Sequence, residues 1–472
     1  MSPIQLVFMK VLLVNPPYQR TIEAIAQTTV GPPMGLAYLA GAVRHFGHEV
    51  EILDANALDL TPLATVERSL AAGAQVIGLT AATPTMHLCG EIGSGIRAGG
   101  FDGKLLIGGP HPTALPEATL LDWPAFDLAA LGEAEETLVE LLDAFAADQP
   151  LSGIAGLCIR DGDNLVRTAI RTTPLDLDAL APPARDLLPW QAYVSPDGRS
   201  AATVIASRGC PAPCTYCAVP AHFGSRLRRR DPKHIAAEVL ELADRLGVAW
   251  VNFIDDTFTW NRRWVLDLCS ELVALDLHKR VRWLCLTRVD RVDAQMLSTM
   301  RRAGCRRIEM GIECASPEGI AALGKGIDEA QVVEAFQIAR DEGLETLAFA
   351  MVNVPGETLA DIDRTGDLLE RVDPDYLQLT FCTPYPGTRL YHEALAAGRL
   401  RTHDFREFRF LRRAVLDNGV LTESQVFGAH RRLQRRFWLR PKVVGRMLKR
   451  MAAQPGGRLA TARMALKALS HL

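Results

Sequence analysis

The sequence contains no uninterrupted run of about eighteen apolar residues, the length that a helix needs to cross a bilayer. The apolar stretch at residues 4–14 is short, is interrupted by Lys10 and is followed by Asn15-Pro16-Pro17, so we expect a buried first strand there. A secretion signal, a solenoid-type repeat and a low-complexity segment are also absent. These absences predict a globular, cytoplasmic protein.

Charge of one sign is not in excess over the chain as a whole. The 52 Lys and Arg nearly balance the 55 Asp and Glu, so the net charge gives no reason to expect a nucleic-acid partner. The 472 residues, 48% of them hydrophobic, are enough for two or three domains with large cores. The exception is the C-terminus, where residues 431–472 hold 12 Lys or Arg and no Asp or Glu.

The sequence also lacks the phosphate-binding loops of nucleotide enzymes. No Gly-x-Gly-x-x-Gly follows the first expected strand, and no Walker loop occurs. The chain has 10 cysteines, of which only three are clustered. Scattered cysteines in a long chain without a secretion signal predict reduced thiols rather than a disulfide framework.

The clustered cysteines follow the pattern Cys210-x3-Cys214-x2-Cys217. Three thiolates this close on one loop can bind three irons of a four-iron, four-sulfur cube and leave the fourth iron without a protein ligand. A structural zinc site is the alternative, but it needs four ligands, and only His222 follows at a usable spacing. The pattern therefore favours a cluster with one open iron.

The first 150 residues alternate short β-branched runs with helical patterns, which predicts a doubly wound parallel sheet. We expect strands at 10–14, 49–53, 76–79, 104–107 and 128–131. Ligands of such sheets lie at the carboxyl ends of the strands. The candidate binding residues at these ends are Asn15, Pro17, Thr83, Thr85, Gly108, Gly109, Pro110, His111, Gly132 and Glu133.

A linker, a second α/β unit and a tail are expected after this domain. Residues 151–200 contain a hairpin pattern and then a Pro- and Asp-rich connector, which is typical of a linker. Residues 201–395 predict six βα units, with strands at 203–206, 250–254, 282–286, 307–312, 346–352 and 376–381. Six such units suit a partial (β/α)6 barrel, and residues 396–472 follow as a basic helical region.

Residues 200–395 resemble the radical S-adenosylmethionine (SAM) enzymes, because the cysteine loop follows the first strand and polar residues end the next four. The resemblance implies that Cys210, Cys214 and Cys217 hold a catalytic [4Fe-4S] cluster whose open iron chelates SAM. It also implies a set of SAM-binding residues: Tyr216 near the adenine, Asp255 and Asp256 at the amino group, Arg288 at the carboxylate or ribose, and Glu313, Pro355 and Gly356 after the fourth and fifth strands. Each of these also has an ordinary structural explanation as a cap or turn residue.

Together with the N-terminal domain, the chain resembles the cobalamin-binding subfamily of these enzymes over residues 10–395. Gly108-Gly109 lacks Cβ atoms that would keep a large flat ring away from the backbone. The Asp-x-His-x-x-Gly loop of other cobalamin proteins is absent, since Asn15-Pro16-Pro17 stands in its place, and His87 follows a different strand. The resemblance thus implies base-off cobalamin without a histidine ligand. Nucleotide or flavin binding, or a purely structural domain, are the alternatives.

The resemblance implies an enzyme that cleaves SAM reductively and transfers a methyl group from methylcobalamin to an unactivated carbon. The first alternative uses the same cofactors for ring formation, oxygenation or rearrangement, as in anaerobic magnesium-protoporphyrin ester cyclases. The second is a cobalamin or cluster sensor that catalyses no reaction. The expected partners are a small-molecule substrate, which could be hydrophobic, and a reductant such as flavodoxin or ferredoxin.

The basic tail has two interpretations. Apolar residues at helical spacing between its cations would let it lie on an anionic membrane surface, which would add membrane association to the cytoplasmic location. Alternatively, it forms a helix that closes the barrel with a solvated cationic face, and we favour this second interpretation.

Overall fold

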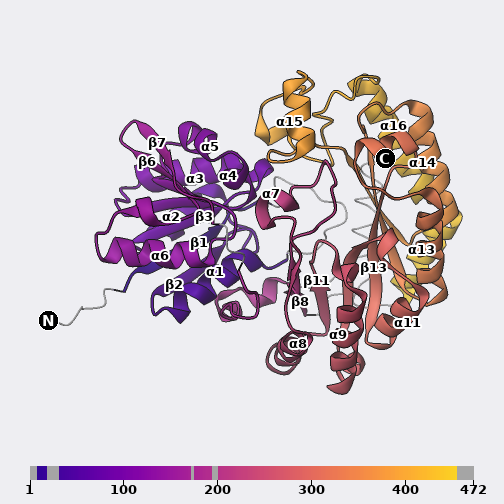
Figure 1. Ribbon diagram of the computed structural model, residues 1–472, viewed down its shortest axis with the longest axis horizontal. Helices are drawn as coiled ribbons and strands as arrows, with labels where there is room; N and C mark the ends of the chain where they lie inside the picture. The colour runs from indigo at the N-terminus through magenta and orange to yellow at the C-terminus, as the bar shows by residue number, and fades with distance from the viewer. Residues whose placement is uncertain (1–7, 19–30, 172–174, 194–199, 454–472) are drawn as a thin grey trace.

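A computed structural model describes residues 8–18, 31–171, 175–193 and 200–453. The remainder of the first apolar stretch and of the basic tail, residues 1–7 and 454–472, lies outside the described residues. Two α/β units lie side by side, each built on its own sheet (Figure 1). Among the described helices, none is both long and apolar enough to cross a membrane.

The N-terminal sheet has the strand order β2-β1-β3-β4-β5-β6-β7, and its first five strands run parallel. Successive side chains of a strand point to opposite faces, so β1 supplies both cores of this unit: Val11 and Leu13 to one, Leu12 and Val14 to the other. The five strands are β1 (Lys10–Asn15), β2 (Glu49–Asp54), β3 (Val76–Thr80), β4 (Lys104–Gly108) and β5 (Leu128–Ala130).

Helices cover both faces of this sheet. The first core includes Leu36 of α1 and Leu138 of α6, whereas the second includes Ile92 of α3 with Val66 of α2 packed against it. The helices are α1 (Met34–His45), α2 (Pro62–Ala71), α3 (Met86–Ala98) and α6 (Glu135–Ala146). This arrangement confirms the expected doubly wound, Rossmann-like fold.

The expected hairpin of the linker region joins the N-terminal sheet. β6 (Leu157–Asp161) pairs antiparallel with β5, and β7 (Asn164–Arg167) pairs with β6. The N-terminal sheet therefore extends beyond residue 150, and the segment that acts as a connector begins after β7.

The second sheet has six parallel strands in the order β15-β14-β13-β12-β11-β8, and it curves as an open barrel. Each strand neighbours the next along the chain, as expected for consecutive βα units. The strands are β8 (Ala201–Val204), β11 (Trp250–Phe253), β12 (Arg282–Arg288), β13 (Cys305–Glu313), β14 (Glu345–Val352) and β15 (Tyr376–Phe381). The expected partial barrel is confirmed.

The helices of the second unit lie outside its sheet (Figure 1). They are α8 (Pro232–Leu246), α9 (Arg262–Ala274), α11 (Ala294–Arg302), α13 (Glu329–Asp341), α14 (Leu359–Val372), α16 (Glu423–Trp438) and α17 (Pro441–Ala453). The shorter elements are α4 (Pro110–Ala114), α5 (Pro116–Asp122), α7 (Val219–Phe223), α10 (Leu277–Arg280), α12 (Pro317–Ala322), α15 (Arg389–Ala396), β9 (Ser207–Arg208) and β10 (Arg228–Arg229). Of these, α7 lies between the two units in Figure 1.

Candidate functional site

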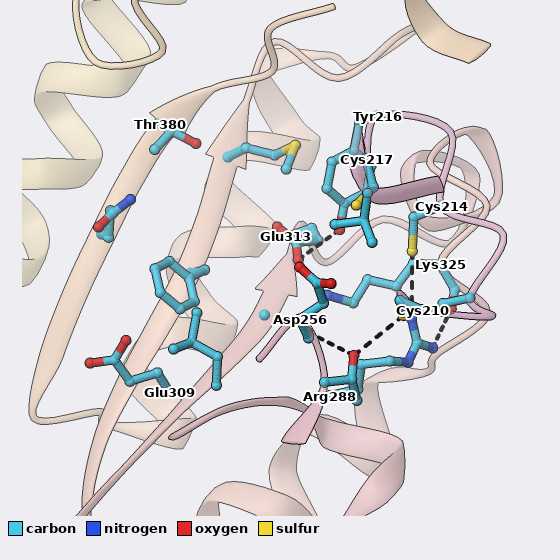
Figure 2. Close-up of a pocket in the computed structure, with 18 of the residues that line it drawn as sticks. Cys210, Cys214, Tyr216, Cys217, Asp256, Arg288, Glu309, Glu313, Lys325 and Thr380 are labelled. Atoms are coloured by element: carbon cyan, nitrogen blue, oxygen red, sulfur yellow. Dashed lines mark hydrogen bonds and ion pairs between the residues drawn. The ribbon is translucent and has the colours of Figure 1, made fainter. Parts of the chain in front are cut away.

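The three clustered cysteines line one cavity of about 420 Å³ at the carboxyl ends of the barrel strands (Figure 2). They lie on the loop that follows β9, and all three are free thiols. Figure 2 shows Arg288 and Lys325 beside the cysteines, and the Arg288 guanidinium donates to the sulfur of Cys214 at 3.6 Å. Three cysteine thiols beside two cations in a partly enclosed cavity are suited to hold a metal cluster.

Burial is the main influence on the acidity of these thiols. It raises the pKa of Cys214, although the Lys325 and Arg288 cations oppose the rise. It raises the pKa of Cys217 to about 12. Because thiolates are the metal ligands, loading a cluster here must release protons, and the two cations would then compensate the new negative charge.

The geometry disfavours the structural zinc site. Within the part of the chain that the structure describes, no three His, Cys, Asp or Glu side chains are close enough to share one metal ion. A cube suits a wider separation, since each thiolate binds a different iron. His222, the only candidate for a fourth zinc ligand, lines a different cavity.

A buried charge pair lies beside the cysteine loop. The Lys325 ammonium donates to the Glu313 carboxylate, which also accepts a hydrogen bond of 3.0 Å from the Tyr216 hydroxyl. Glu313 has a φ of 60°, and the pairing of β13 with β14 shifts register there. A side chain at Gly311 would collide with both partners, because a Cβ there would lie 2.3 Å from the Glu313 carboxylate and 2.4 Å from the Lys325 nitrogen.

Sequence reasoning placed Glu313 and Tyr216 in the site but missed Lys325. Lys325 follows a short helix, α12, rather than a strand, so strand-end reasoning could not find it. The only local signal is the pair of glycines around it, Gly324 and Gly326, which both have positive φ values.

The two adjacent aspartates after β11 have different surroundings. Asp255 is buried and accepts hydrogen bonds from the Ser207 hydroxyl at 2.5 Å and the Ala206 amide at 3.3 Å. Asp256 accepts a hydrogen bond from the backbone of Gly209. Burial raises the pKa of Asp255 to about 7 and that of Asp256 to about 6. Both carboxyls line the cavity and fasten the segment that leads into the cysteine loop.

The remaining expected SAM-binding residues divide into two groups. Arg288 lines the cavity and is held by Asp290 at 2.8 Å and by the Lys325 carbonyl at 2.6 Å. Pro355 and Gly356 are not among the residues that line it. The Gly356 amide instead donates to the carbonyl of Asn418 at 2.9 Å, so this turn contacts the segment before α16.

A second cavity, of about 340 Å³, opens at the carboxyl ends of the N-terminal strands. Of the ten candidate binding residues, five line it: Gly108, Gly109, Pro110, Gly132 and Glu133. Gly109 has a φ of 100° and Gly132 a φ of 69°, which favour glycine. Gly35 also lines the cavity, and a Cβ there would meet no atom within 4 Å, so this backbone is open to a ligand.

The other five candidates in this domain make contacts within the protein instead. Asn15 donates to the Asp54 carboxylate at 2.8 Å, and Pro17 is buried. The side chain of Thr83 lies 3.2 Å from His111, and the Thr85 hydroxyl bonds the backbone of Ala82. Burial lowers the pKa of His111 to about 4. None of these five is among the lining residues.

One arginine connects the two cavities. Arg208, two residues before Cys210, is nearly buried and lines the second cavity. Its guanidinium pairs with Glu133 at 2.6 Å and with Glu135 at 2.7 Å. Glu133 also binds Arg228 of the barrel unit. The loop that carries the cysteines is thus fixed to the loop at the end of β5.

Both units match known domains. Residues 204–369 match the Radical SAM superfamily, and residues 24–142 match the B12 binding domain. The chain is 34% identical over 441 residues to an uncharacterized methyltransferase of Pyrococcus horikoshii, an alignment that covers 92% of this chain and 94% of the relative. It is 28% identical over 439 residues to the anaerobic magnesium-protoporphyrin IX monomethyl ester cyclase of Cereibacter sphaeroides, which covers 92% of this chain and 71% of the relative.

A solved structure has the same fold. TsrM, a radical S-adenosylmethionine methyltransferase from Kitasatospora setae with cobalamin and a [4Fe-4S] cluster bound, superposes with a TM-score of 0.70. The two sequences are 20% identical, and the match covers 84% of this chain and 76% of that one.

The raised pKa of Asp255 predicts a pH dependence of folding in the cofactor-free chain. Because the folded state holds this proton up to about pH 7 and an unfolded chain only to 3.8, stability is fully present at low pH and decreases as the pH rises. Urea unfolding should show that the wild-type protein loses about 2–3 kcal/mol of unfolding free energy between about pH 5 and about pH 8. The Asp255→Asn variant should not show this loss.

The neighbouring aspartate provides the matched control. The pKa of Asp256 is raised only to about 6, so Asp256→Asn should flatten the curve below that pH and leave the slope above it. Parallel stability curves for wild type and Asp255→Asn would contradict the prediction.

Proposed function

The chain belongs to the cobalamin-binding radical SAM enzymes, which use a [4Fe-4S] cluster, SAM and cobalamin, and from this premise we propose that it methylates an unactivated carbon of a small molecule. One observation carries the proposal: the cavity of the cluster cysteines and the cavity of the B12-binding unit share a wall residue, Ile254. A methyl group held in one cavity would need only a short path to a carbon activated in the other.

The cluster and SAM together supply a 5′-deoxyadenosyl radical that can abstract hydrogen from unactivated carbon, and cobalamin supplies the methyl group. The chain's own residues bind and orient. We assign Asp256 to the SAM ammonium, since a carboxylate there makes a charge-assisted hydrogen bond. Arg288 would face the SAM carboxylate or ribose, and Tyr216 the adenine, with Asp255 and the pair Glu313–Lys325 holding these groups in place.

Pro355 and Gly356 have less support as SAM contacts. They follow β14, as expected for such contacts, but they are not among the residues that line the cavity. We retain them as a proposed boundary of the site, in which the backbone contact of Gly356 to Asn418 holds the turn after the strand.

We propose that the cobalamin is bound base-off, with no histidine below the cobalt. The loop after β1, where other cobalamin proteins have this ligand, begins with Pro16-Pro17, and Asn15 at the end of the strand donates to Asp54. His111 is buried against Phe405, with 4.7 Å between ring centroids. His222 lines the cavity from α7 of the barrel unit, not from the loop after β1 where other cobalamin proteins have this ligand.

The remaining lining of the cluster cavity supports a hydrophobic substrate. Its walls away from the cysteines are largely aromatic and aliphatic: Leu286, Phe349, Met351, Phe381, Tyr385 and Phe410. Glu309 contributes a carboxyl group to these walls, and burial raises its pKa. The chemistry also requires a one-electron reductant such as flavodoxin or ferredoxin. The near-neutral net charge of the chain gives no support to a nucleic-acid partner.

The second candidate function keeps both cofactors but ends in ring formation, oxygenation or rearrangement. The 28% identity to a magnesium-protoporphyrin ester cyclase over nearly the whole chain favours it. Both candidates share the radical step, so the outcome of that step distinguishes them.

The radical step predicts substrate-independent cleavage of SAM. After anaerobic reconstitution with iron, sulfide and cobalamin, the protein should form 5′-deoxyadenosine from SAM and dithionite, measured by chromatography. Cys214→Ala should lose this activity, because one iron loses its thiolate. The matched control is Cys269→Ala, a buried cysteine on α9 outside the cavity, which should retain it. Retention of cleavage by Cys214→Ala would contradict the assignment.

The fate of the methyl group tests the methylation itself. Extract of the native host, supplied with SAM labelled in its methyl group and with the reconstituted protein, should yield a labelled product. The Cys214→Ala protein should yield none. A new unlabelled product in the presence of 5′-deoxyadenosine formation would favour the cyclase-like alternative.

For the basic tail, we propose that α17, but not α16, contacts an anionic membrane as a peripheral element of a cytoplasmic protein. α16 buries Val426, Leu433 and Phe437 against the barrel core, as expected of a closing helix. α17 buries Val443 in the barrel core but leaves Val444 and Leu448 exposed at 39% and 59%. Its exposed Lys442 and Lys449 would add attraction to anionic headgroups.

Binding to vesicles tests this contact. Each lysine near an anionic surface contributes about 1 kcal/mol, so Lys442→Gln/Lys449→Gln should weaken binding to phosphatidylglycerol-containing vesicles by roughly tenfold or more in a sedimentation assay. The control is Lys233→Gln/Lys279→Gln, which removes two lysines from other helices. Equal binding of both variants would contradict the proposal.

A further inference from the structure

Ile254 is a large aliphatic residue in an unusual position. It follows the buried strand β11, yet its side chain is 45% exposed. It lines the cavity of the cluster cysteines and also the cavity of the B12-binding unit, and among the described residues no other lines both.

The backbone on both sides of Ile254 is firmly held. Its amide donates to the Val204 carbonyl at 3.3 Å, which continues the sheet pairing. Phe253 before it is buried in the barrel core, and Asp255 after it is buried and bonded to Ser207. The side chain therefore projects from a fixed point, and its size alone decides how much space it fills.

Helix α7 completes the boundary between the two cavities. Val219 and Pro220 at its start line the cluster cavity, whereas His222 and Phe223 at its end line the other. Figure 1 shows α7 between the two units. The boundary between the cavities is thus formed by Ile254 after β11 and by α7. Most of its side chains are apolar.

We propose that Ile254, with α7, is a positioning residue that partitions the two cofactor sites and sets how closely the cobalamin face and the SAM site approach. This inference rests on the proposed function. An aliphatic partition has no hydrogen-bonding group, so it cannot hold water between the two sites. A smaller side chain would join the two cavities, and a larger one would narrow the passage between them.

Ligand exchange at cobalt measures the partition without any substrate. Full-length protein, reconstituted with its cluster and loaded with hydroxocobalamin, is mixed with sodium azide, and the exchange is followed by absorbance. Ile254→Ala should exchange faster than wild type by on the order of tenfold, equivalent to about 1.4 kcal/mol of barrier. Ile254→Phe should exchange more slowly than wild type, and the volume-conserving Ile254→Leu should restore the wild-type rate.

The exchange rate should rise in Ile254→Ala and fall in Ile254→Phe. A folding defect would instead change both rates in the same direction, so the two explanations can be distinguished. Ile338→Ala is the matched control, because Ile338 is a partly buried isoleucine on α13 outside both cavities. Rates for Ile254→Ala and Ile254→Phe that equal the wild type, or that change together, would overturn the inference. Such a result would contradict the partition but not the proposed methyl transfer. Absence of a methylated product would contradict the proposed function but would not alter the azide exchange rates.

Discussion

The buried ion pairs of Arg208 hold the two cofactor loops in one arrangement. Arg208 precedes the cysteine loop by two residues, and its acceptors Glu133 and Glu135 lie at the end of the N-terminal sheet. All three side chains are nearly excluded from water, so removal of Arg208 would leave the Glu135 carboxylate buried without this cation, at a cost of about 3–5 kcal/mol. The two units are therefore joined by a contact that is expensive to break.

This constraint explains why the two cavities adjoin. In a doubly wound sheet and in a partial barrel alike, the site forms at the carboxyl ends of the strands, but nothing in either fold makes two such ends face each other. Here the arginine of one unit reaches the acidic loop of the other, and Tyr38 of α1 adds a contact with 5.1 Å between its ring and the Arg208 guanidinium. The facing arrangement is thus specified by charge and aromatic contacts at the border.

Sequence reasoning found the strands and the residues that follow them, because both depend on local pattern. It could not decide which strand-end side chains face a ligand. Asn15 and Gly108 end two parallel strands of one sheet, yet Asn15 donates to Asp54 while Gly108 lines the cavity. Arg208 was missed because its partner Glu133 is distant in sequence, and Lys325 was missed because it follows a helix and not a strand.

The chemistry assigned to this fold also accounts for the kind of side chain at each point. Near the thiols, where negative charge would accumulate on a loaded cluster, the protein places Arg288 and Lys325 and fixes them with carboxylates. Between the cavities it places Ile254 and the apolar start of α7 instead. A charged or hydrated group at that boundary would bring water between the two cavities. A hydrocarbon side chain held by a rigid backbone excludes water. The volume of the Ile254 side chain, and not a charge, therefore determines how far the two cavities are separated.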